Sequence, residues 1–195
     1  DGEEFTGIGR GVGVDLGVVQ PIEAFDIYTG KGGVISPFAG YMFTKNLGLM
    51  AQLQALGATN FDRVGVKDDD ATWIVGGAAG PRLAVPLGEG ELYGTFQGGM
   101  FTGLAPNSVT DTSFGFSTGA GINGPVTDDF LLGIWIRFNR LYQRIHATGD
   151  VQYVSAGVGL TFDLGPKAPP PPPPPVVRAA APEPAPAPAI KKKIV

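Results

Sequence analysis

The sequence predicts an all-β fold: an eight-stranded antiparallel up-and-down transmembrane β-barrel, followed by an extended proline-rich tail. Two-residue alternation of apolar with small or polar residues recurs through the first 165 of the 195 residues, and helical periodicity is almost absent. The connectors between the alternating segments switch between long and short, as they do in a meander whose successive turns lie at opposite ends. No stretch approaches about 18 consecutive apolar residues, so a membrane-spanning form of this chain has to be a barrel.

Eight segments carry the strand pattern. In chain order they are 8–20, 33–43, 47–59, 72–85, 91–102, 113–123, 130–142 and 151–163. The long connectors are 21–32, 60–70, 103–112 and 143–150, and the short ones are 44–46, 86–90 and 124–129. Bacterial outer-membrane barrels have the same asymmetry, with short periplasmic turns and long outer loops. An even number of strands also places both ends of the barrel at the short-turn side.

Each segment has an apolar parity and a small or polar parity. The apolar rows begin at Val12, Ile35, Leu47, Trp73, Phe114, Leu132 and Val154, and segment 91–102 shows the polar row Glu91, Tyr93, Thr95 and Gln97. A soluble eight-stranded calyx would turn the apolar rows inward, whereas a membrane barrel would turn them towards lipid. The polar rows are rich in glycine and poor in lysine and glutamate. Small residues suit a narrow lumen better than a water-facing surface, which favours the membrane barrel.

Aromatic residues gather at the strand ends. The predicted meander puts Phe43, Phe130 and Phe162 at the short-turn end, and Trp73, Phe114, Phe116 and Tyr142 at the long-loop end. Two such girdles are the interfacial pattern of a barrel in a bilayer.

Two prolines do not fit the strand pattern, because Pro37 and Pro81 lie inside predicted strands of a closed sheet. We expect a bulge at Pro81, after which the parity that turns Arg82 inward could slip.

The lumen is predicted to hold a paired polar network. Four charges have inward parity, namely Asp15, Arg82, Glu91 and Arg137. Buried charges need partners, so we expect ion pairs surrounded by hydrogen-bonding side chains, namely Gln52, Gln54, Tyr93, Gln97 and Tyr153. Eight strands leave an interior that side chains can fill, and Trp135 would help to fill it. A wide diffusion pore is therefore not expected.

The composition changes near Gly165 and divides the chain into a barrel, 1–165, and a proline- and alanine-rich linker, 166–195. All 31 glycines precede this point, and twelve of the 18 prolines follow it. The tail cannot bury enough apolar surface to fold, and its seven consecutive prolines favour an extended polyproline helix. The whole chain has a net charge of −4 and the tail has five basic and one acidic residue, so the barrel segment has −8. This acidic balance argues against a nucleic-acid partner.

Signatures of an enzyme, a cofactor site or a metal site are scarce. A rim constellation of the only histidine, His146, with Ser108 and Asp111 or Asp150 is conceivable, but only composition supports it. The acidic stretch 62–70 lacks the spacing of an EF-hand, and the chain has no cysteine. We therefore predict no catalytic residue, no cofactor and no metal site.

Two segments and the tail together resemble outer membrane protein A-like proteins. The segments are "SPFAGYMFTKNLGLMAQLQAL" (36–56) and "SAGVGLTF" (155–162). The second is similar to the signal read by the barrel-insertion machinery, carried here by Ser155, Gly157, Leu160 and Phe162. The resemblance implies a Gram-negative outer membrane, surface-exposed long loops, and a proline-rich hinge on the periplasmic side. The peptidoglycan-binding domain of that family has no counterpart within residues 1–195, so its binding residues are not carried over.

The function expected from these features is that of a non-enzymatic anchor and tether. The barrel would hold the chain among outer-membrane lipids and lipopolysaccharide, after assembly by the insertion machinery, and the tail would reach towards the cell wall or a periplasmic partner. A small porin-like channel gated by the lumen network is the alternative. A soluble ligand-binding calyx is a third interpretation.

Overall fold

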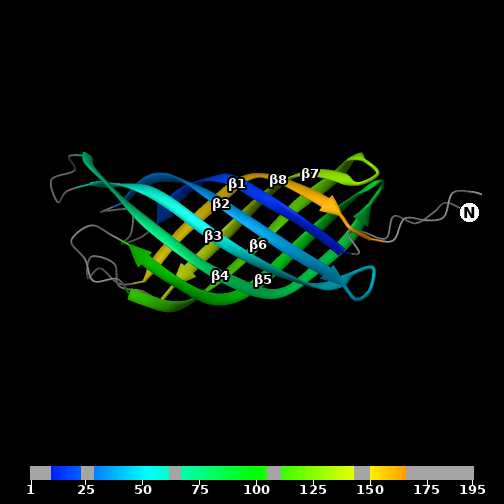
Figure 1. Ribbon diagram of the computed structural model, residues 1–195, viewed down its shortest axis with the longest axis horizontal. Helices are drawn as coiled ribbons and strands as arrows, with labels where there is room; N and C mark the ends of the chain where they lie inside the picture. The colour runs from blue at the N-terminus through cyan, green and yellow to red at the C-terminus, as the bar shows by residue number, and fades with distance from the viewer. Residues whose placement is uncertain (1–9, 23–28, 62–66, 105–110, 143–149, 166–195) are drawn as a thin grey trace, which may run out of the picture.

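The computed structural model describes residues 10–22, 29–61, 67–104, 111–142 and 150–165. They form eight strands (Figure 1): β1 (Arg10–Ile22), β2 (Thr29–Met42), β3 (Leu47–Phe61), β4 (Lys67–Leu87), β5 (Gly90–Leu104), β6 (Asp111–Thr127), β7 (Phe130–Leu141) and β8 (Val151–Asp163). Each strand pairs antiparallel with the next, and β8 pairs with β1, so the sheet is a closed barrel. Among the described residues, no helix is long and apolar enough to cross a membrane. The predicted all-β barrel is confirmed, and the predicted linker 166–195 lies outside the described residues.

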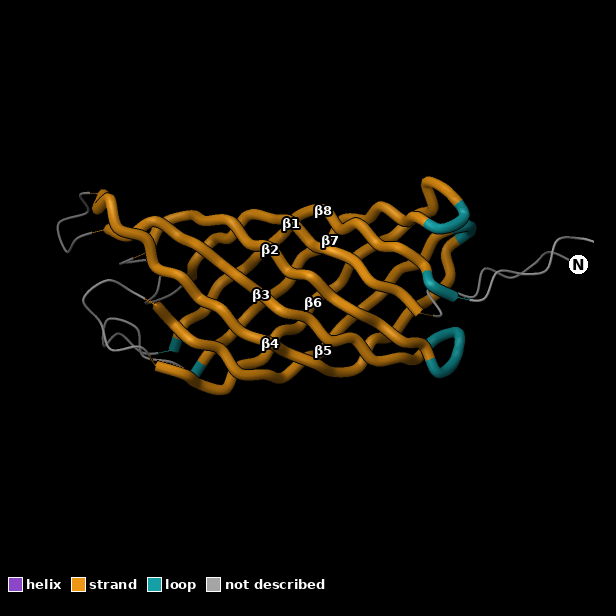
Figure 2. The backbone as a smooth tube through the Cα atoms, viewed as in Figure 1, coloured by secondary structure: helices purple, strands orange, loops and turns teal. Residues whose placement is uncertain are grey.

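Three short connections lie together at one end of the barrel (Figure 2). They are residues 43–46, 88–89 and 128–129. The β4–β5 connection depends on Gly88, whose φ of 62° is in the left-handed region that side chains disfavour. Because β1 begins and β8 ends at the same side, we call it the turn end and the opposite side the loop end. The three connectors predicted to be short are therefore all at this end, whereas the predicted long connectors lie largely outside the described residues.

Several strands are longer than the alternation predicts. β4 has 21 residues, and it includes residues 68–70, which were predicted to lie in a loop. β6 continues to Thr127, where a turn was expected. The difference arises because ladder pairing uses main-chain groups and continues past the point where the side-chain pattern stops. The β3–β4 hairpin consequently extends beyond its neighbours at the loop end (Figure 1).

Pro81 does not shift the register of the ladder around it. Ala79 pairs with Gly98 and Arg82 pairs with Thr95, so the offset between β4 and β5 is the same on both sides of the proline. The predicted bulge at Pro81 is therefore wrong. A proline removes one main-chain donor, but it does not insert a residue into the strand. Arg82 accordingly keeps its inward parity and is buried.

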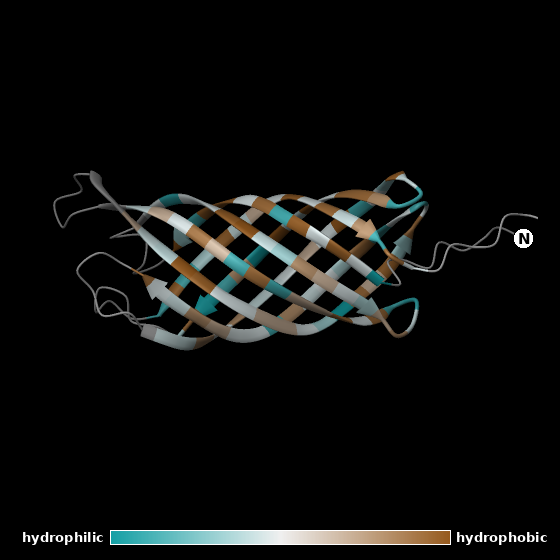
Figure 3. Cartoon of the chain, viewed as in Figure 1, coloured by the Kyte–Doolittle hydropathy of each residue, from teal (hydrophilic) through white to brown (hydrophobic). Residues whose placement is uncertain are grey.

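The apolar rows face outward. Leu16, Leu49, Ile134 and Val158 have exposed fractions of 43 %, 49 %, 64 % and 46 %, although they belong to four different strands. Hydrophobic bands alternate with paler or hydrophilic ones over much of the barrel wall (Figure 3). A soluble calyx would bury these side chains, so that interpretation is wrong. A continuous exposed apolar belt on a closed barrel is the surface of a protein surrounded by lipid.

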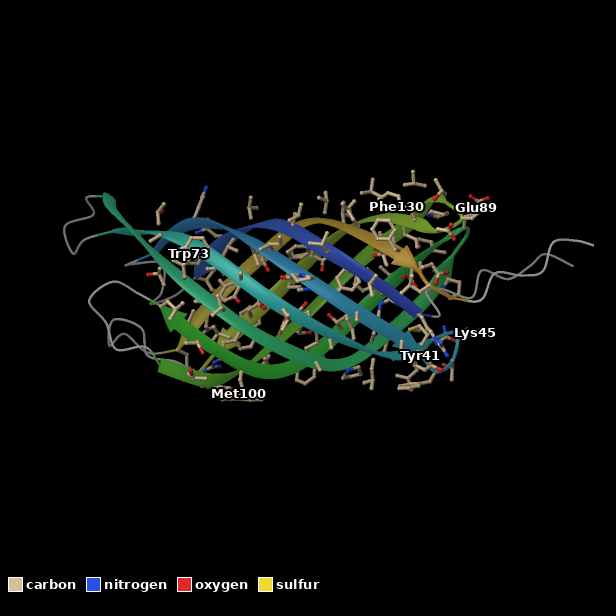
Figure 4. The ribbon with its side chains drawn as sticks, viewed as in Figure 1. Tyr41, Lys45, Trp73, Glu89, Met100 and Phe130 are labelled. Carbon is tan, nitrogen blue, oxygen red and sulfur yellow. The ribbon has the colours of Figure 1, made fainter. Side chains whose placement is uncertain are left out.

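Aromatic rings cluster at both ends of the belt. At the turn end, Phe130 and Phe162 have ring centroids 5.3 Å apart, and Phe43 lies 5.4 Å from Tyr41. At the loop end, Phe114 stacks on Tyr142 at 6.4 Å. Other members of this group are Phe116, 6.3 Å from Tyr142, and Trp73, which is half exposed. Figure 4 shows Phe130 and Tyr41 near the turn end and Trp73 near the loop end. The rings thus lie at the two ends of the belt, and their placement at the interfaces of a bilayer stays a prediction.

Candidate functional site

The lumen holds two buried ion pairs. The Arg82 guanidinium donates to both carboxylate oxygens of Glu91, with Nη1 3.3 Å from Oε2. Asn123 Nδ2 donates to Glu91 Oε1 at 3.0 Å. In the second pair, Arg137 Nη2 donates to Asp15 Oδ2. All four charged residues are at most 5 % exposed, so each charge is paired where water cannot screen it.

Each of these arginines also lies over an aromatic ring. Arg82 Cζ is 4.7 Å from the centroid of Tyr93, and Arg137 Cζ is 4.5 Å from that of Trp135. Such contacts stabilise a desolvated guanidinium by roughly 2 kcal/mol. Lumen glycines leave space for the rings, since a Cβ at Gly17 would lie 2.8 Å from Trp135. Side chains therefore fill the lumen at this level.

The remaining polar side chains predicted for the lumen are also buried. Gln54 Nε2 donates to Tyr153 OH at 2.8 Å, across 99 residues of sequence. Gln97 Nε2 donates to the Met50 carbonyl at 3.3 Å. Gln52 is 3 % exposed, and its amide has no hydrogen bond to the described protein atoms. The structure thus buries all nine predicted residues in one lumen, where hydrogen bonds and ion pairs join several of them in small groups, while the Gln52 amide has no hydrogen-bond partner among the described atoms.

Sequence reasoning missed an apolar layer at the loop end of the lumen. Seven of the eight strands contribute a buried apolar side chain to it, and we call this set the apolar layer: Val19, Val34, Leu56, Ile74, Phe101, Leu141 and Val151. β6 contributes Gly115 instead, and a Cβ at that position would lie 2.5 Å from Leu141 Cδ2. The lumen therefore has a cluster of buried apolar side chains in addition to its polar part.

The charges and the apolar layer occupy different levels of the lumen. Four strands carry both a lumen charge and a residue of the apolar layer, and on each of them the charge is nearer the turn end. The charge and the apolar residue are Asp15 and Val19, Arg82 and Ile74, Glu91 and Phe101, and Arg137 and Leu141. Two small cavities of about 10 Å³ each border Arg82. A cavity of that size holds about one water molecule. The four lumen charges therefore lie nearer the turn end, and the apolar layer lies nearer the loop end.

The four residues of the predicted insertion signal lie on β8, the last strand. Ser155 and Gly157 face the lumen, where Ser155 Oγ accepts a hydrogen bond from Asn139 Nδ2 at 3.2 Å. Leu160 and Phe162 lie on the outer parity, and Phe162 is 52 % exposed. Reading of this signal by the insertion machinery remains a prediction.

The hypothetical catalytic constellation at the rim is only partly visible. His146 and Ser108 lie outside the described residues, and nothing is described of the Asp111 side chain. Asp150 is bound by Arg140, whose Nη2 lies 2.7 Å from Asp150 Oδ2. Within the described ranges, no group of three or more histidine, cysteine, aspartate or glutamate residues is placed to hold a metal ion.

Comparison with known proteins agrees with this architecture. The sequence model of the family described as "Outer membrane protein beta-barrel domain" matches residues 2–162. The chain belongs to this family. No curated protein sequence matches it. This family membership and the apolar belt locate the protein in the outer membrane.

Two solved structures share the fold of this outer-membrane barrel. Neisserial surface protein A (NspA) superimposes with a TM-score of 0.62 at 15 % identity, covering 80 % of this chain and 97 % of that one. The outer membrane protein OprG from Pseudomonas aeruginosa gives a TM-score of 0.55 at 10 % identity, covering 80 % and 98 %. At such identities the likeness concerns the fold alone.

Proposed function

We propose that this protein is a non-enzymatic outer-membrane anchor whose barrel holds a proline-rich spacer at the periplasmic surface. The single observation that carries the proposal is a lumen occupied by paired charges and by the apolar layer. A barrel whose charges are paired and whose loop end is plugged by the apolar layer offers no continuous aqueous path. What remains functional is the outer surface, which binds lipid, and the segments attached to the barrel ends.

The proposed orientation puts the turn end in the periplasm and the long connectors at the cell surface. Barrels of this kind have short periplasmic turns and longer outer loops. β8 ends at Asp163 at the turn end, so the segment 166–195 would leave on the periplasmic side. The partners we propose are outer-membrane lipid, lipopolysaccharide, the insertion machinery during assembly, and a periplasmic or membrane protein that the spacer positions.

A small porin-like channel is the second candidate function. Buried lumen atoms without a hydrogen-bond partner favour it, among them Gln52 Nε2 and Ser117 Oγ, because such atoms are well suited to binding water. The two functions differ in one property, since a channel has to conduct ions through the level of the apolar layer.

Conductance in planar lipid bilayers tests the proposal. We expect the refolded chain to give no discrete conductance steps, because the apolar layer excludes hydrated ions. A variant in which Leu56, Phe101 and Leu141 are all replaced with alanine removes three large side chains of that layer and is the positive control, for which steps are expected. Discrete steps from the unaltered chain would show that the barrel is a channel.

The reach of the proposed spacer is a separate prediction. The chain has no cysteine, so L164C and V195C introduce two unique positions for spin labels. An extended polyproline segment of this length spans up to roughly 90 Å at about 3.1 Å per residue. A Gly/Ser segment of equal length has a root-mean-square span of roughly 30 Å. Double electron–electron resonance is expected to give clearly longer distances for the natural segment, and equal distances would rule out a stiff spacer.

A further inference from the structure

We propose that the lipid-facing surface between β2 and β3 carries a binding groove for one hydroxylated acyl chain of a membrane lipid. The groove has a volume of about 310 Å³ and is bordered by Pro37, Phe38, Ala39, Ala51, Gln52 and Leu53. These six residues occupy three consecutive facing positions on the adjacent strands β2 and β3 (Figure 1), of which Phe38 with Gln52 and Ala39 with Ala51 are paired in the ladder. The volume is at the lower end of the roughly 300–1,000 Å³ typical of small-molecule sites.

Main chain forms the floor of this groove. The side chains of Phe38 and Gln52 point into the lumen, where Phe38 borders the small cavity beside Asp15 and Arg82. Because these side chains point inward, Phe38 and Gln52 border the outer groove with their backbone atoms. The outward side chains on the two strands include Ala39 and Ala51, which are too short to cover that backbone. The outward neighbour Leu53 is 65 % exposed and forms a wall. The depression therefore exposes peptide groups to the hydrocarbon of the bilayer.

One of those peptide groups lacks its ladder donor. The register places Pro37 opposite Leu53, because Ile35 pairs with Ala55 and Phe38 with Gln52. Within the described parts of β2 and β3, the two rungs at residues 36 and 37 are missing from the ladder. Both rungs need an N–H at residue 37, which proline does not have. The Leu53 carbonyl is thus left without the donor that an N–H at residue 37 would supply.

The chemistry of this site specifies its ligand. An unsatisfied carbonyl costs several kcal/mol in hydrocarbon, where no water can bind it. The molecule that satisfies it has to be apolar enough to lie in the groove and has to bring one hydrogen-bond donor. An acyl chain with a hydroxyl group meets both conditions. A plain acyl chain fills the same volume, but it leaves the carbonyl unpaired.

The second strand proline provides an internal comparison. Pro81 removes the corresponding donor from the β4–β5 ladder, opposite Phe96. The outward Phe96 ring is bulky and lies 6.1 Å from Phe116. At Pro37 the next outward residues towards the turn end are Ala39 and Ala51, and the groove lies over them beside the missing donor. Pro81 is consequently a matched control for the loss of a ladder bond alone.

Native mass spectrometry of the full chain, refolded in detergent micelles, tests the proposal with two probes. They are 3-hydroxytetradecanoic acid and tetradecanoic acid, which differ in one hydroxyl group. We expect one molecule of the hydroxylated acid to bind, about tenfold more tightly than the plain acid, which is the discrimination that one satisfied hydrogen bond provides. Equal binding of the two acids, or no saturable binding of either, would overturn the proposal.

Four variants locate the site and the preference. Ala51→Leu fills the groove and is expected to abolish binding, whereas Ala120→Leu, on the outer face of β6, is expected to leave it unchanged. Pro37→Ala restores the missing N–H and is expected to remove the tenfold preference, whereas Pro81→Ala retains it. A shift in gel migration between unboiled and boiled samples shows that each variant is folded, and Ala39→Leu replaces Ala51→Leu if the latter does not fold. Retained preference in Pro37→Ala contradicts the role of the Leu53 carbonyl.

Discussion

Replacement of Arg137 with alanine is expected to lower the free energy of unfolding by about 3–5 kcal/mol. The change leaves the Asp15 carboxylate buried inside the barrel without its ion-pair partner. It also removes the cation–π contact with Trp135. Urea titration of the full chain in lipid vesicles, followed by tryptophan fluorescence, measures the loss.

Two further variants distinguish the energetic cost of a buried unpaired charge from the cost of losing one ion-pair contact. Arg140→Ala removes a similar ion pair, to Asp150, but its side chains are 40 % and 30 % exposed, so we expect a loss of about 0–1 kcal/mol. The double variant Asp15→Leu with Arg137→Met removes both charges and is expected to be more stable than Arg137→Ala alone. Equal losses for Arg137→Ala and Arg140→Ala would show that the lumen is hydrated enough to solvate Asp15.

The direction in which each side chain points could be predicted from the sequence alone. A strand has a side-chain period of two, so a single apolar row fixes the orientation of every residue on that strand. The scarcity of lysine and glutamate in the opposite rows then decided between lipid and a dry core. Arg82 shows how robust this reasoning is, because its inward position survives the neighbouring proline.

The partners of the buried charges could not be predicted in the same way. Arg137 pairs with Asp15 across 122 residues, from β7 to β1, with β8 between them. That contact depends on how the barrel closes and on the stagger of its strands, and no local pattern in the sequence contains either. Arg82 and Glu91 lie on one hairpin only nine residues apart, yet the side-chain pattern did not assign them to each other either.

The apolar layer was missed because the sequence was interpreted by parity alone. Its signal is a run of two adjacent apolar residues near a strand end, such as Val18 with Val19 or Trp73 with Ile74. In each run one residue faces lipid and the other faces the lumen. A polar lumen would break these runs. Runs at the loop end of several strands therefore indicate that the lumen is apolar there.

Replacement of Ile136 with arginine is expected to cost about 2–4 kcal/mol of stability, because the side chain lies on the lipid face near the middle of β7. Its ladder partners are Ala120 and Ala156, which have no side-chain group to bind a guanidinium. Leu87→Arg is the matched control: Leu87 is similarly exposed but ends β4 at the turn end, where an arginine reaches the interface and about 0–1 kcal/mol is expected. Urea titration in vesicles compares the stability losses of the two variants.

Equal losses in the two variants would mean that the belt does not span a bilayer. A small loss at Ile136 with a large loss at Leu87 would place the hydrocarbon core elsewhere along the barrel. Because the lumen is unchanged in both variants, this comparison tests the lipid-facing surface independently of the ion pairs.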